Sequence, residues 1–254
     1  MSKKIEKLLS FNKIMALLHS VQAIAVVALS TEFLVPITTS YQVFNPAKQS
    51  LEITSEQLFD IRLAYLVAGF FALSALAHIY VAFIRPKQYV KDIKNGINKA
   101  RWIEYSASAS LMMVAIAMLS GIEDLSTLIM IFTLTALMNL MGLVMEIHNQ
   151  TTQKTNWLSY WIGCLAGIVP WVVIGLYFWG SEQSGVGDIP TFVYWIYVSI
   201  FVFFNLFAVN MILQYKGIGK WKDYLYGERA YIILSLVAKS LLAWQVFAGA
   251  LRPV

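Results

Sequence analysis

A lysine stands near the middle of an apolar segment close to the C-terminus. The segment runs from Arg229 to Gly249 and places Lys239 ten residues from either end. At about 1.5 Å per helical residue, it is about long enough to cross a hydrocarbon core of about 30 Å. A charged lysine there costs at least about 2.5–3.5 kcal/mol, which makes it a functional candidate. A desolvated lysine is a good amine nucleophile, and Schiff-base formation with a carbonyl compound is its best-known use. Two plainer roles remain open, which are packing against a carboxylate and lining a water-filled pore.

A glutamate in an earlier apolar segment is the candidate partner of this cation. A charge at mid-bilayer needs a counter-charge. Glu104 is the strong candidate within the expected hydrocarbon region, because Asp60 and Glu146 fall near segment ends. We therefore expect Glu104 to pair with Lys239. Arg101 precedes Glu104 by three residues and shares its helical face.

The composition identifies the setting of these residues as a membrane. The 254 residues are 59% hydrophobic and 13% charged, whereas a soluble domain carries about 25% charged residues. We expect one domain, 1–254, in the lipid bilayer, with its first apolar segment retained because it is too long for a signal-peptide core. The net charge of +5 predicts no nucleic-acid partner, since the cations cluster beside the apolar segments. The single cysteine, Cys164, allows no intrachain disulfide.

The chain is predicted to be all-α, a bundle of seven transmembrane helices. Basic loops are expected at 85–99 and 214–229, and a glycine-rich acidic loop at 180–188. Pro170 is expected to kink the fifth helix. The expected spans are Phe11–Val35, Leu58–Ile84, Ala100–Ser120, Leu125–Ile147, Trp157–Trp179, Pro190–Leu213 and Arg229–Gly249.

A polar connector between the first two spans has β-prone sequence. Thr38–Phe44 and Ser50–Thr54 flank the turn-like residues Asn45–Lys48. This pattern predicts a short β-hairpin on the membrane surface.

Charge is sorted between the two sets of connectors. The N-terminus and the loops at 85–99 and 214–229 are basic, and the linker at 149–156 is weakly basic, whereas the remaining connectors carry mostly acids. Positive-inside reasoning therefore places the N-terminus in the cytoplasm, and seven spans leave the C-terminus and the hairpin outside.

Two histidines share the cytoplasmic half of the bilayer with the lysine and the glutamate. Taken alone, His19 and His78 each fit a hydrogen-bonded core histidine. Together with Glu104 and Arg101, they predict a hydrated polar cavity on the cytoplasmic side. A zinc site made of the two histidines and Glu104 lacks a spacing signature, so we expect no metal site.

The outward half of the predicted bundle is nearly bare of titratable groups. From Ser240 to Gly249 the last span offers only Ser240 and Gln245 as polar residues. A proton or ion pump needs titratable groups on both sides of its switch, so this bareness argues against transport.

Aromatic residues crowd the fifth and sixth spans and could form a flat apolar slot for a ligand. Ordinary packing and interfacial belts explain most of them equally well. Trp161, Phe204 and Trp244 are the candidates for lining the slot.

The combination of motifs resembles the heliorhodopsins, a branch of the microbial rhodopsins. Ser235-Leu-Val-Ala-Lys239 is similar to that family's serine–xxx–lysine signature, and Arg101-Trp-Ile-Glu104-Tyr105 is similar to its helix-three motif. His19 and His78 match its two cytoplasmic-half histidines. The cytoplasmic N-terminus agrees with the inverted orientation of that family.

The resemblance implies all-trans-retinal bound to Lys239 as a protonated Schiff base, with Glu104 as counterion and Ser235 as a hydrogen-bonding neighbour. It makes Tyr105 a cofactor-binding candidate, and it keeps the released proton near His19 and His78. It also implies a slow photocycle, a signalling or regulatory role without pumping or enzymatic activity, and a homodimer to which the hairpin contributes.

Two other classes of function stay open on the sequence. One is a retinal-based ion pump or channel. The other is a seven-helix transporter or membrane enzyme that uses Lys239 without a chromophore. The basic inner loops also allow a cytoplasmic acidic protein as a partner.

Overall fold

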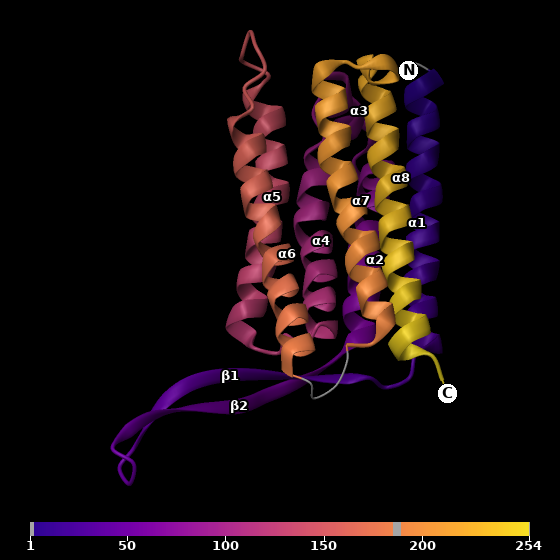
Figure 1. Cartoon of the computed structure of the whole chain (residues 1–254). Helices are drawn as coiled ribbons and strands as arrows, with labels where there is room; N and C mark the ends of the chain where they lie inside the picture. The colour runs from indigo at the N-terminus through magenta and orange to yellow at the C-terminus, as the bar shows by residue number, and fades with distance from the viewer. Residues whose placement is uncertain (1–2, 185–188, 254) are drawn as a thin grey trace.

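The computed structural model describes residues 3–184 and 189–253 of the chain. Seven helices within these residues are long and apolar enough to cross a membrane, as the sequence predicts. They run side by side in one bundle, with the N-terminus at one end and the C-terminus at the other (Figure 1). Their bounds are α1 (Lys3–Leu29), α2 (Leu63–Ile79), α4 (Lys99–Leu119), α5 (Leu125–His148), α6 (Leu158–Ser184), α7 (Thr191–Lys216) and α8 (Tyr224–Val246).

Neighbouring helices enclose α4. Helix α4 packs against α2 and α5 and also contacts α7, while α1 packs against α2 and α8. A larger share of α4 is buried than of any other spanning helix in the described residues. The helix that carries Arg101 and Glu104 therefore lies at the centre of the bundle.

The hairpin is confirmed and is longer than predicted. Strands β1 (Leu34–Asn45) and β2 (Ser50–Arg62) are antiparallel, with Tyr41 opposite Thr54 and a bulge after Ile37. The predicted first and second spans are wrong by about five residues where they meet the hairpin, because residues 34–37 pair with residues 59–62 in the ladder. Paired strands satisfy their backbone groups without a helix.

The hairpin crosses the C-terminal end of the bundle and extends past α5 and α6 (Figure 1). Its turn is closed by the Asn45 side chain, which accepts hydrogen bonds from the amides of Ala47 and Lys48. Its base is held beneath the α4–α5 connection, where the Thr38 amide donates to the Glu123 carbonyl at 2.9 Å.

Three predicted loops are partly helical. The basic loop at 85–99 contains α3 (Pro86–Lys94), which starts with a proline and buries Tyr89 and Ile93. The loop at 180–188 is helical as far as Ser184, and its residues 185–188 lie outside the described part of the chain. The loop at 214–229 divides between the end of α7, a 3-10 turn (Gly219–Lys222) and the first turns of α8.

Short π-helical segments extend two of the helices. Tyr80–Ile84 continues α2, and Phe247–Leu251 continues α8. Helix α6 runs through Pro170 without ending there.

Candidate functional site

Three helices meet at Lys239. The lysine is buried on α8, and its Nζ lies 3.0 Å from Oε1 of Glu104 on α4. The same nitrogen donates to the hydroxyl of Ser235 at 2.8 Å, one turn earlier on α8. Glu104 also accepts a hydrogen bond of 2.6 Å from Ser74 on α2. The structure thus brings together the lysine, the glutamate and the serine that the sequence singles out.

This pair is a salt bridge with almost no access to solvent. The side chains of Lys239 and Glu104 are 3% and 7% exposed. Removing one partner of such a pair leaves an uncompensated charge and typically costs about 3–5 kcal/mol. The lysine also faces the ring of Tyr105 at 5.2 Å, in cation–π geometry. The Tyr105 hydroxyl is anchored by a 2.9 Å hydrogen bond to the Tyr231 carbonyl.

The two histidines lie against each other. The rings of His19 on α1 and His78 on α2 are stacked, with centroids 5.5 Å apart. His78 Nδ1 lies 2.7 Å from Oδ1 of Asn12, an acceptor, so this nitrogen carries the proton. His19 is fully buried, and neither of its ring nitrogens has a hydrogen-bond partner in residues 3–184 or 189–253. No metal-binding group of three or more His, Cys, Asp or Glu residues occurs in those same ranges.

Arg101 does not pair with Glu104. Its guanidinium binds two other buried carboxylates, Glu146 on α5 and Glu228 on α8. Asn98 supports both acids, donating to Glu146 through its backbone amide at 2.9 Å and to Glu228 through its side chain at 2.8 Å. The cluster of one cation and two carboxylates is the part of the site that the sequence reasoning missed.

Helical spacing could have identified this second cluster. Glu228 lies in the predicted basic loop at 214–229, yet it precedes Lys239 by eleven residues, about three helical turns, and so shares its face if the helix begins earlier. Glu146 follows the buried Asn139 by seven residues, about two turns, on α5. Both acids therefore point to the interior once their segments are known to be helical.

A small polar cavity joins the two charged clusters. It has a volume of about 30 Å³ and is lined by His78, Asn98, Arg101, Glu104 and Tyr105, among others. This is room for at least one water molecule, with enough polar groups to hold it. The cavity thus borders Glu104 of the lysine pair and Arg101 and Asn98 of the second cluster.

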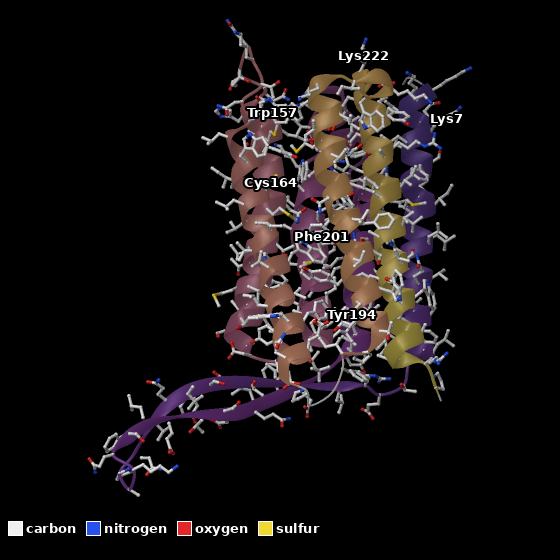
Figure 2. The ribbon with its side chains drawn as sticks, viewed as in Figure 1. Lys7, Trp157, Cys164, Tyr194, Phe201 and Lys222 are labelled. Carbon is white, nitrogen blue, oxygen red and sulfur yellow. The ribbon has the colours of Figure 1, made fainter. Side chains whose placement is uncertain are left out.

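An apolar cavity lies on the other side of Lys239. A smaller compartment of about 40 Å³ borders Lys239, Tyr105 and Ser235 and shares Met138, Asn139, Phe204 and Phe207 with a larger one of about 140 Å³. The larger compartment lies between α5, α6 and α7, where Cys164 and Phe201 line it (Figure 2). Trp171 packs edge-to-face against Phe201 and Phe204 at its far wall.

Of the three residues predicted to line the slot, Phe204 lines both compartments, whereas Trp161 and Trp244 line neither. Trp161 is 63% exposed. The cavity face of α6 carries Tyr160, Gly163, Cys164, Gly167 and Trp171, so Trp161 is turned away by about 100°. Trp244 donates to Gln22 of α1 at 3.3 Å. It follows Lys239 by five residues, so it lies on a different face of α8.

Comparison with known proteins gives the family. The family model described as Heliorhodopsin matches residues 8–251. The chain belongs to the heliorhodopsin family. A solved structure with a similar fold is a light-driven proton pump from Leptosphaeria maculans, with 14% identity, a TM-score of 0.63, and coverage of 98% of this chain and 96% of that chain. This identity shows the fold alone. No curated protein sequence matches the chain.

Membership in the heliorhodopsin family makes this a multi-pass membrane protein of the photoreceptor type with a retinal chromophore. The residues around Lys239 fit such a ligand. The apolar cavity borders a primary amine and is walled by aromatic and methionine side chains. A Cβ at Gly167 would collide with Met138, and one at Gly142 would collide with Trp102, so both glycines let cavity-wall side chains pack closely against the backbone.

Proposed function

We propose that this heliorhodopsin is a light sensor that transports no ions, with all-trans-retinal attached to Lys239. The observation that carries the proposal is the buried Lys239–Glu104 pair, whose lysine borders an apolar cavity. When bound there as a protonated Schiff base, retinal supplies visible absorption and isomerisation by light.

The residues around Lys239 have separate roles in this proposal. Glu104 is the counterion and holds a positive charge at the Lys239 nitrogen, while Ser74 and Ser235 fix both groups by hydrogen bonds. Tyr105 and Phe204 line the cofactor cavity. His19 and His78, the latter beside the polar cavity that also borders Arg101, keep a released proton within the half of the bundle that contains the N-terminus.

The distribution of buried charge supports the absence of transport. Among the described residues, every buried charged side chain belongs to the Lys239 pair or the Arg101 cluster. The core between Lys239 and the hairpin is made of apolar side chains such as Met113, Ile116 and Val246. A pump requires titratable groups on both sides of its switch, and within residues 3–184 and 189–253 this core buries no acid, histidine, lysine or arginine.

The sorting of basic and acidic connectors supports a cytoplasmic N-terminus, with the hairpin and the C-terminus outside. Helix α3 then presents the exposed Lys87, Lys91 and Lys94 to the cytoplasm, a surface suited to an acidic protein partner. The hairpin exposes Phe44, Leu51 and Ile53, which suits a contact between two copies of the chain in a homodimer.

Two measurements on the protein expressed with all-trans-retinal test this proposal. A visible absorption band is expected in the purified protein, and its absence contradicts a retinal protein. Illumination of cells that carry the protein is expected to leave the external pH unchanged. A light-driven pH change that a protonophore abolishes would instead identify a pump, the competing class of function.

A further inference from the structure

A basic groove lies between the first turns of α1 and the start of α8, at the end of the bundle away from the hairpin. Its volume is about 880 Å³. Four cations line it, namely Lys3, Lys4, Lys7 and Arg229, against two acids, Glu6 and Asp223. Lys7 marks its position on α1 (Figure 2).

The basic groove carries unneutralised positive charge. Lys4 Nζ pairs with Asp223 at 2.6 Å. This pair leaves Lys3, Lys7 and Arg229 against Glu6 alone, so the net charge is 3 − 1 = +2. In the described part of the chain, these three cations form no ion pair. The groove therefore favours an anionic ligand.

The wall of the groove changes from cationic to apolar along α1. Lys3, Lys7, Phe11 and Ile14 follow one another at intervals of three or four residues, so they share one face of the helix. Ile14 lines the groove and is 53% exposed, and Leu18, one turn further into the span, is 39% exposed. Lys7 and Ile14 are separated by about 10 Å along the axis, comparable with the step from headgroups to hydrocarbon.

Arg229 faces this stripe from α8. Its guanidinium lies 5.8 Å from the centroid of the Phe11 ring, and this contact holds it beside α1 at the boundary between the cationic and apolar parts. A guanidinium is a planar donor that matches phosphate oxygens, and a lysine adds a point charge.

We propose that the basic groove binds the phosphate headgroup of an anionic phospholipid, with an acyl chain lying along Ile14 and Leu18. A soluble anion or an acidic peptide would leave the apolar continuation of the groove uncovered. A zwitterionic lipid would bring its own ammonium group towards unpaired cations. The proposal is independent of the proposed light-sensing function, because no groove residue borders the Lys239 site.

Lipid binding to the purified full chain in detergent tests this proposal by native mass spectrometry. Phosphatidylglycerol is expected to bind more tightly than phosphatidylcholine with the same acyl chains. The double variant Lys7→Gln/Arg229→Gln should weaken phosphatidylglycerol binding about tenfold or more, since each cation near an anionic headgroup contributes separately. Lys91→Gln/Lys94→Gln, which removes the same charge from α3, should leave it unchanged.

Three results of the binding measurements would overturn the proposal, and a competition experiment adds a fourth. They are equal binding of the two lipids, unchanged binding by the groove variant, and an equal loss in the α3 variant, which would indicate diffuse surface charge. Inorganic phosphate and a hexaglutamate peptide are added as competitors to separate the ligand classes. Displacement of the lipid by either at equal concentration would show that the groove recognises a soluble anion or an acidic protein segment instead. An unchanged circular dichroism spectrum establishes that each variant is folded.

Discussion

Arg101 and Glu104 lie one turn apart on α4 and yet bind different partners. Arg101 reaches the carboxylates of Glu146 and Glu228, whereas Glu104 accepts from Lys239. Adjacent opposite charges on a helix commonly pair with each other. Here each charge is neutralised from a different helix, which leaves Glu104 free to serve as the counterion of the lysine.

Replacing Lys239 by alanine should abolish the visible band, because the amine that attaches the chromophore is lost. The absorption spectrum after purification with retinal measures this. Lys222→Ala, which removes an exposed lysine at the end of the bundle, is the matched control and should remain coloured. A coloured Lys239→Ala protein would refute attachment at this residue.

Replacing Glu104 by glutamine should shift the visible band to longer wavelength, since a counterion stabilises the positive charge of the ground state at the nitrogen. The band should also be lost at a pH about 1–3 units lower, the usual effect of one opposite charge at this distance. A spectroscopic pH titration measures both. Glu123→Gln, a change at the hairpin end, should match the wild type, and an unshifted Glu104→Gln protein would exclude this residue as the counterion.

The Arg101 cluster predicts that removing its cation destabilises the protein more than removing one of its two acids. Arg101→Gln leaves two buried carboxylates without their cation and should cost about 3–5 kcal/mol of stability. Glu228→Gln keeps the Arg101–Glu146 pair and should cost less, about 1–3 kcal/mol. Thermal loss of the visible band ranks the two variants. Equal stability of the two variants would show that Arg101 does not stabilise the cluster more than Glu228 does.

Two tryptophans on α6 allow a controlled test of the cavity wall, because only one of them lines it. Trp171 is 4% exposed and packs on Phe201 and Phe204, whereas Trp161 is 63% exposed. Trp171→Ala should destabilise the protein by about 3–5 kcal/mol through the cavity it leaves, and should alter the absorption maximum. Trp161→Ala should do neither. The reverse ranking would place the chromophore slot elsewhere.

Asp124 caps α5 where the hairpin meets the bundle. Hydrogen bonds from the Ser126 hydroxyl and the Thr127 amide lower the pKa of its carboxyl from the usual value. Its stabilisation is therefore present above the unfolded pKa of about 3.9 and is lost as the pH falls through the lower folded value. Asp124→Ala should cost about 0.5–2 kcal/mol at neutral pH.

Asp124→Asn is the control for this cap, because asparagine caps helices equally well without titrating. In thermal melts, the Asp124→Asn variant should be as stable as the wild type at pH 7. Its stability should fall less than that of the wild type when the pH is lowered below 4. An unchanged acid dependence would assign the titration to other groups.

The sequence by itself determined the seven spans, the hairpin, and the pairing of Lys239 with Glu104. The spans and the hairpin follow from local sequence patterns, and the pairing follows from the small number of acids at the depth of Lys239. Apolar runs of about twenty residues must be helical in a bilayer, and a buried cation with one acid at its depth has little choice of partner.

Only the tertiary structure decided the rest. The ends of the first two spans depend on strand pairing between residues far apart in the chain. The partners of Arg101 come from α5 and α8, and the rotation of each helix placed Trp171 in the cavity wall and Trp161 outside it. Residue spacing shows which side chains share a helical face, but the direction of that face is set by the packing of neighbouring helices.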